Sequence, residues 1–195
     1  MTKSKKSTVK TVTIMIVLAG IIFCAFMYFM NQEDVGESVS GTDQTEVQKL
    51  LAKDFSKEYP PTAREVMKRY ARILKCIYSG EVTTEEVAQL GELILGLYSE
   101  ELLAVNPYDS YIKELQNEVE EYSQANRVVI SYMVDSGNNT ITWTKDGVDY
   151  SRILATFTTQ EDTIFNKSSE EFVLKLDEEG RWKIVGWRIV DKEDL

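Results

Sequence analysis

Residues 172–191 read FVLKLDEEGRWKIVGWRIVD, and this stretch decides the fold. Phe172, Leu174 and Leu176 share one phase of a two-residue repeat, which predicts a strand with one apolar face. The turn sequence DEEG then reverses the chain, because glycine and short acidic residues favour tight turns. The following WKIVGWRIV predicts a second strand, antiparallel to the first.

The second strand changes phase partway along its length. Trp182 and Ile184 lie in one phase, whereas Trp187 and Ile189 lie in the other, and Gly186 stands between the two pairs. One extra residue in an antiparallel strand forms a β-bulge, and glycine inside a strand often marks such a site. We therefore expect a bulge at Gly186 that returns both pairs to one face of the sheet.

The same period of two continues upstream of this hairpin. It predicts strands over residues 128–134, 140–145 and 148–158. Asp146-Gly147, between the last two, is a strong two-residue hairpin signal. Consecutive strands with short turns between them predict an antiparallel sheet.

The half of the domain before these strands has the period of helices. Apolar residues recur every three to four positions in four segments before residue 125. Thr62 with Glu65, and Thr83 with Glu86, have the spacing of a capping box, and Asn106-Pro107 precedes the last segment. Helices followed by consecutive strands predict an α+β fold, in which the helices pack on the apolar face of a curved antiparallel sheet.

The terminal stretch also supports a family resemblance. Its apolar strand, acidic glycine turn, Trp-Lys-Ile-Val and Gly-Trp resemble the last hairpin of the nuclear transport factor two-like superfamily. The resemblance implies a cone of helices wrapped by a bent sheet over residues 45–195. A lysine-rich start, one apolar span and such a domain also resemble an uncharacterised family of single-pass proteins of Gram-positive anaerobes. The superfamily includes enzymes, ligand binders and scaffold parts of conjugation and secretion machines, so the resemblance does not choose a function.

An uncharged stretch near the start predicts a membrane anchor. Residues 11–30 would rise about 30 Å as a helix, which matches the hydrocarbon core of a bilayer. A cleaved signal peptide is the alternative, but it would end at a site with small residues, and residues 28–32, YFMNQ, offer none. Lysines precede the stretch and acids follow it, so the positive-inside rule places the N-terminus in the cytoplasm. The expected organisation is a cytoplasmic basic tail over 1–10, a transmembrane helix over 11–30, a flexible acidic tether over 31–44 and an extracytoplasmic α+β domain over 45–195.

Composition excludes several classes of site. Four of the 22 Lys and Arg residues precede Met30 and all 32 Asp and Glu residues follow it, so the part after Met30 has 18 cationic and 32 anionic side chains, a formal charge of −14. Such a surface repels phosphate backbones, so no nucleic acid partner is expected. The chain has no histidine, which excludes a Ser-His-Asp relay and removes the commonest zinc ligand. We expect no metal site, no cofactor and no identifiable catalytic residue, and we expect lipid contact only through residues 11–30.

Three classes of function fit this layout. The leading hypothesis is an interaction or scaffold module, an accessory part of an envelope complex of conjugation or secretion type. It would bind a protein partner or a second copy of itself. A tether that confines a domain beside the membrane raises its effective concentration for such partners. A dry, filled cone would favour this hypothesis.

The second hypothesis is a small-ligand pocket at the mouth of the cone. Aromatic walls with a few polar groups are typical of such pockets. The candidate lining residues are Tyr132, Trp143, Tyr150, Arg152 and Trp187. Aromatic residues on strands also commonly fill the interface between a sheet and its helices. An open aromatic cavity without acids would favour ligand binding.

The third hypothesis is an acid–base enzyme. An apolar pocket raises the pKa of a carboxyl group until the group can transfer a proton near neutral pH. The candidates are Tyr108, Asp109, Tyr150 and Arg152, of which Asp109 is also well placed to complement a helix dipole. A buried carboxylate with a raised pKa in a deep apolar cavity would favour this hypothesis.

Overall fold

The computed structural model describes residues 44–53 and 57–190, where helices are followed by a sheet of five strands. All of these elements fall in the compact unit Gln44–Leu195. The expected transmembrane helix over 11–30 lies outside the described residues, as does nearly all of the expected tether. Within the described ranges, every helix is too short or too polar to cross a membrane.

The bounds of the helices are α2 Glu46–Leu51, α3 Ala63–Ile77, α4 Thr84–Leu95, α5 Glu100–Val105 and α6 Tyr108–Gln124. Two of the helices, α3 and α4, begin where the threonine caps predict. Thr83 and Glu86 form the complete capping box that their spacing predicts. At α3, the Thr62 hydroxyl accepts a hydrogen bond from the Glu65 amide, which is one half of the box. The short helix α5, capped by Ser99, was not expected from the sequence.

The strands form one antiparallel sheet, as the short turns predict. They are β1 Arg127–Val134, β2 Ile141–Lys145, β3 Val148–Glu161, β4 Ile164–Leu176 and β5 Trp182–Val190. The order is β1-β3-β4-β5, and β2 pairs with the first part of β3. Asp146 and Gly147 both have positive φ angles, 52° and 80°, as the predicted two-residue hairpin requires.

Strand β4 is longer than its sequence suggests. The alternation that starts at Phe172 predicts only its last part, but the strand begins at Ile164 and pairs with β3 from there to Lys175. Residues 164–171 read IFNKSSEE, which has no apolar alternation. Pairing with a long neighbouring strand therefore determines the conformation of this segment, because strand formation depends strongly on context.

The predicted bulge in β5 is confirmed. Gly186 pairs with Val173 and Ile184 pairs with Leu174, so Val185 is the extra residue. Beyond it, Trp187 stands opposite Phe172. The two halves of β5 thus place their large apolar side chains on the same face of the sheet.

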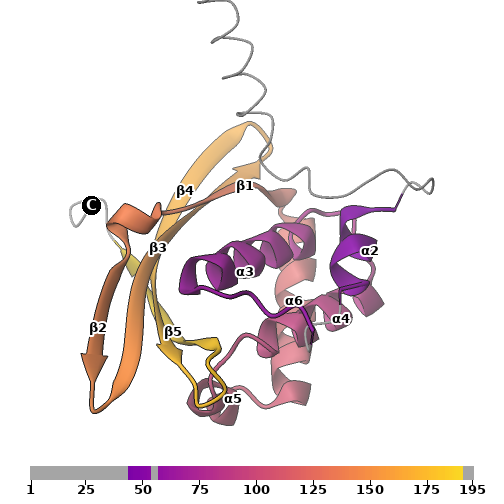
Figure 1. Cartoon of the computed structure of the whole chain (residues 1–195). Coiled ribbons are helices and arrows are strands. Elements are labelled where there is room, and N and C mark those ends of the chain that lie inside the picture. Colours follow the sequence, from indigo (N-terminus) through magenta and orange to yellow (C-terminus); the bar gives the residue numbers. More distant parts are fainter. Residues whose placement is uncertain (1–43, 54–56, 191–195) are drawn as a thin grey trace, which may run out of the picture. The chain divides into compact units, whose positions relative to one another are not determined.

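The sheet bends around the helices, and α3 lies across its inner face (Figure 1). We name the side that faces the helices the concave face and the opposite side the convex face. Ser151, Ile153 and Ala155 of β3 are buried on the concave face, and Phe172 and Leu174 of β4 lie beside them. These residues pack against the apolar stripes of α3 and α4 to form one core.

This packing predicts different costs for two phenylalanines of β4. Phe172 is 0 % exposed, whereas Phe165, near the other end of the strand, is 62 % exposed. Phe172→Ala should lower the free energy of unfolding by about 3 to 5 kcal/mol, because it removes a fully buried ring. Phe165→Ala should change it by no more than about 0.5 kcal/mol. Urea denaturation of both variants measures the difference, and equal losses would contradict the burial of Phe172.

Candidate functional site

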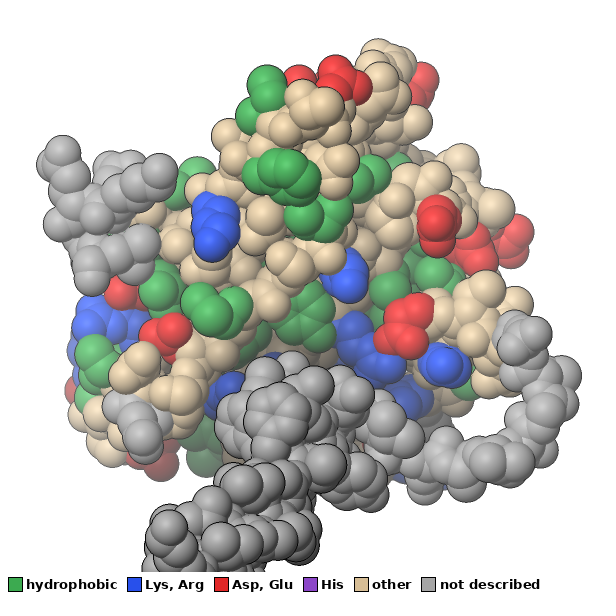
Figure 2. All heavy atoms as spheres, turned by 90° about the horizontal axis from the view of Figure 1, so that it is seen from above, with side chains coloured by type: hydrophobic (Ala, Val, Ile, Leu, Met, Phe, Trp, Pro, Cys, Tyr) green, Lys and Arg blue, Asp and Glu red, His purple; other side chains and the backbone are tan. Residues whose placement is uncertain are grey.

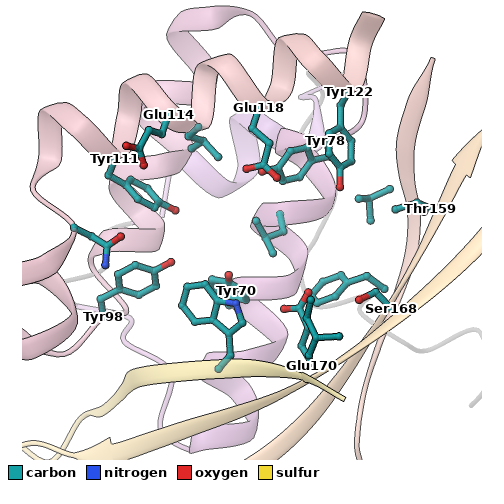
Figure 3. A pocket seen from close by; sticks show the side chains of 17 residues that line it. Tyr70, Tyr78, Tyr98, Tyr111, Glu114, Glu118, Tyr122, Thr159, Ser168 and Glu170 are labelled. Atoms are coloured by element: carbon teal, nitrogen blue, oxygen red, sulfur yellow. The ribbon is translucent and has the colours of Figure 1, made fainter. Parts of the chain in front are cut away.

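A cavity of about 470 Å³ lies between α3, α6 and the concave face of the sheet (Figure 3). Five tyrosines and one tryptophan contribute to its wall. The remaining lining side chains are three glutamates, three uncharged polar residues and five apolar residues. The full set is Tyr70, Leu74, Tyr78, Tyr98, Asn106, Tyr111, Glu114, Leu115, Glu118, Tyr122, Val129, Phe157, Thr159, Ser168, Glu170, Trp187 and Ile189.

Helical spacing places the tyrosines of α3 in the cavity. Tyr70 and Leu74 of α3 and Tyr78, the residue that caps its C-terminus, follow one another at intervals of four, so all three lie on one side of the helix. The rings of Tyr78 and Tyr122 lie 4.6 Å apart and join α3 to α6 at this wall. Tyr70 and Tyr78 are buried, so core packing holds both rings in place at the wall of the cavity.

Tyr98 is positioned by backbone hydrogen bonds to the sheet. The Ile184 amide donates to the Leu97 carbonyl, and the Ser99 amide donates to the Ile184 carbonyl, each at 2.8 Å. These two bonds hold the segment after α4 against β5. Tyr98 therefore enters the cavity from a tied segment, although it lies in neither a long helix nor a strand.

Three tyrosine hydroxyls are linked inside the cavity. Tyr98 forms side-chain hydrogen bonds with both Tyr70 and Tyr111. Burial raises the pKa of all three above the usual value for tyrosine. The hydroxyls therefore stay protonated and neutral, and they offer ring faces and oxygen lone pairs without a negative charge.

Trp187 reaches the opening because of the bulge. Its indole stacks on the ring of Phe172 with centroids 5.6 Å apart, and Tyr70 and Tyr98 lie 6.4 and 6.0 Å from it. The side chain is still 43 % exposed. Trp187 thus has one side packed on the core, while part of its surface faces the cavity and solvent.

Carboxylates face this aromatic space from two walls. Figure 3 shows Glu118 extending from α6 and Glu170 from β4 into the same region. Burial raises the pKa of Glu170, and the negative charge of Glu118 raises it further. Within the described residues, no group of three or more acidic or cysteine side chains lies close enough to hold a metal ion.

The five residues that we predicted from the sequence to form a ligand site do not lie together in the structure. Trp187 lines the cavity. Tyr132 stands opposite Phe157 and packs against the core, but it is not part of the cavity wall. Trp143 and Tyr150 stack on each other at 5.4 Å on the convex face, and Arg152 lies on that face too, 3.5 Å from Glu171. Four of the five are therefore not at the cavity.

The candidates for acid–base chemistry also lie away from the cavity. Tyr108 and Asp109 are exposed at the start of α6, and Tyr150 and Arg152 are on the convex face. We did not propose Tyr70 and Tyr122 as site residues from the sequence, because they fall among the apolar residues that recur at helical spacing. The signal that could have identified them is the presence of tyrosine hydroxyls among those residues, since a buried hydroxyl requires a polar partner.

The comparisons with known proteins give a family and no activity. A family model described as a domain of unknown function, DUF6715, matches residues 1–187. The chain therefore belongs to the DUF6715 family. No curated protein matches it.

The raised pKa of Glu170 predicts an effect of pH on stability. The folded protein holds the Glu170 proton to a higher pH than the unfolded chain does, so the free energy of unfolding falls as pH rises between the two pKa values. Glu170→Gln removes this cost. It should stabilise the protein at pH 7, by about 1.4 kcal/mol for each tenfold change in the acid dissociation constant, and have no such effect below about pH 4.

Glu171→Gln is the matched control. Glu171 is the next residue of β4, but it faces the convex side and pairs with Arg152 and Arg188. Its substitution should be neutral or mildly destabilising at pH 7. Thermal unfolding at pH 4 and pH 7 measures both variants. A loss of stability in Glu170→Gln at pH 7 would refute the confinement of this carboxylate.

Proposed function

We propose that this member of the DUF6715 family is a membrane-tethered domain that binds a small ligand in the cavity between α3, α6 and the sheet. The observation that carries the proposal is the cavity itself. Its volume of about 470 Å³ lies within the range of small-molecule sites, and its wall combines aromatic rings with a few polar groups. A domain that served only as a packed scaffold would have no need to keep this space open.

The positions of the wall residues support binding rather than incomplete packing. Buried Tyr98 and Tyr70 hold their hydroxyls in a hydrogen-bonded group, and Trp187 is braced by Phe172. Rigid aromatic anchors lower the entropic cost of binding, because few side-chain rotations are lost. The cavity is therefore organised before a ligand arrives.

Glu170 fits the hypothesis of an acid–base enzyme as well as that of ligand binding. Its pKa is raised by burial and by Glu118, as such an enzyme requires. The sequence candidates for catalysis do not line the cavity, so the enzyme hypothesis is supported only by this carboxylate, which the sequence had not singled out. Binding accounts for the tyrosines, the tryptophan and the carboxylates together, and we prefer it for that reason.

Residues 11–30 supply the membrane anchor in this proposal. The uncharged stretch would span the cell membrane once with the N-terminus in the cytoplasm. The expected tether over 31–44 would, as a flexible coil, span roughly 20 Å, enough to hold the cavity clear of the lipid headgroups. The ligand would then be taken from the extracytoplasmic side.

Binding can be tested with N-phenyl-1-naphthylamine, a neutral aromatic probe whose fluorescence rises in apolar sites. The chain from Gln44 to Leu195 contains every described element and is free of the apolar stretch 11–30. We expect saturable probe fluorescence, because the probe can occupy the aromatic cavity. Ser168→Trp should lower the affinity at least tenfold by filling the cavity.

Lys167→Trp is the control for this experiment. Lys167 precedes Ser168 on β4, is exposed and does not line the cavity. It adds the same indole on the other face of the sheet, so probe binding should be unchanged. Fluorescence that does not saturate, or equal affinities of the two variants, would count against a binding cavity.

An interaction module remains a second candidate, and one observation favours it. Large apolar side chains are exposed on the convex face at Met133, Ile141 and Trp143. In the view from above, by contrast, apolar side chains are interspersed with charges of both signs (Figure 2). The convex face is therefore where a protein partner with apolar side chains of its own would dock.

A photo-crosslinking amino acid at position 143 tests this candidate in intact cells. The partner hypothesis predicts one discrete crosslinked protein from position 143 and none from position 85, an exposed site at the start of α4. Mass spectrometry of the product identifies the partner. The same pattern from both positions, or no product from position 143, would argue against docking at this face.

A further inference from the structure

The cavity contains negative charge without positive charge. Glu114, Glu118 and Glu170 line it, and none of its lining residues is a lysine or an arginine. The nearby guanidinium of Arg127 lies 5.1 Å from the centre of the Tyr122 ring, but it is paired with Glu161 at 2.6 Å. An anionic ligand would find no counter-charge in this wall. The formal charge of −14 after Met30 adds a field of the same sign.

The carboxylates of Glu118 and Glu170, which face each other, favour the binding of a cation. Glu118 and Glu170 approach the cavity from α6 and β4, on opposite walls (Figure 3). Partial burial and the negative charge of Glu118 make the charged form of Glu170 less favourable, because like charges repel more strongly away from bulk water. A positive group bound between them would neutralise this repulsion and gain attraction to both.

The aromatic wall is suited to the same kind of ligand. The faces of tyrosine and tryptophan rings are the negative part of their quadrupoles and attract a cation placed over them. Trp187 and Tyr98, with ring centroids 6.0 Å apart, are held in fixed positions at the cavity. Tyr111 and Tyr70 add neutral hydroxyl oxygens that can accept hydrogen bonds from an ammonium group.

The size of the cavity excludes a bare ion as its natural occupant. Its volume of about 470 Å³ is many times that of a single water molecule, whose share of liquid volume is about 30 Å³. In the described part of the chain, no cluster of acidic side chains has the geometry to ligate a metal. The cation must therefore have a carbon body that fills the space and contacts the rings.

We infer that the ligand of this cavity is an organic ammonium cation, whose charged group binds between Glu118 and Glu170 and whose carbon body contacts Trp187 and the tyrosines. The inference rests on the proposed ligand-binding function and specifies its ligand class. It assigns the carboxylates to charge recognition and the aromatic rings to contact with the alkyl groups around the nitrogen.

Three probes of one shape separate charge from shape. They are choline, its neutral carbon analogue 3,3-dimethyl-1-butanol and the anion 3,3-dimethylbutyrate. Isothermal titration calorimetry of the full chain in a nonionic detergent measures the dissociation constant of each probe. The method detects the heat of binding, so the probes need no fluorescent label. We expect choline to bind at least tenfold more tightly than the alcohol, and the butyrate not to bind.

Variants then connect the preference to the proposed residues. Glu170→Gln should weaken choline binding about tenfold and leave the alcohol unchanged, because it removes charge and keeps shape. Glu171→Gln, on the convex face, should change neither. Putrescine against 1,4-butanediol repeats the comparison for primary amines.

The outcomes distinguish this inference from the function on which it rests. Equal binding of cations and neutral analogues would overturn the ammonium preference and leave a ligand site. The same holds if Glu170→Gln and Glu171→Gln behave alike. If N-phenyl-1-naphthylamine shows no saturable binding and no cationic probe binds, the proposed function and this inference both fail.

Discussion

One extra residue in the last strand determines which side chains of that strand line the cavity. Val185 shifts the phase of β5, so that Trp187 and Ile189 lie on the concave face with Ile184 instead of on the convex face. Without this shift of phase, Trp187 and Ile189 would point to the convex face, and the cavity wall would lose both of these large apolar side chains. The bulge thus connects a local irregularity of backbone pairing to the composition of the site.

The side chains around Trp187 combine two requirements that oppose each other. Apolar contact of Trp187 with Phe172 and Tyr70 stabilises the domain, whereas the partial burial of Glu170 opposite Glu118 destabilises it at neutral pH. A partly buried carboxylate that serves only the fold would be replaced at little cost by a neutral residue. Its presence in an open cavity is consistent with a functional role, because binding sites commonly sacrifice some stability.

The sequence predicted the parts of the fold that depend on local patterns. Capping residues located α3 and α4, Asp146-Gly147 located the β2–β3 hairpin, and the phase change around Gly186 located the bulge. The first half of β4 and the short α5 were missed, because long-range pairing and a helix of only six residues leave weak signals in the sequence. These failures concern conformations that depend on tertiary contacts.

The site was predicted only in part, for a related reason. Alternation along β3 assigns Tyr150 and Arg152 to one face and Ser151 and Ile153 to the other, but it does not say which face meets the helices. From the sequence we assigned Trp143 and Tyr150 to the cavity, whereas the structure places both on the convex face. Tyrosines such as Tyr70, in the apolar stripe of a helix, look like core until the opposite wall is known.

The central claim is that the cavity confines Glu170 beside a second carboxylate. Carbon-detected NMR titration of the glutamate side chains in the chain from Gln44 to Leu195 tests it directly, with Glu170→Gln used to assign the resonance. The account predicts a Glu170 pKa above that of glutamate in a peptide, and a decrease of that pKa in Glu118→Gln. A Glu170 resonance that titrates like a solvent-exposed glutamate, unaffected by Glu118→Gln, would contradict it.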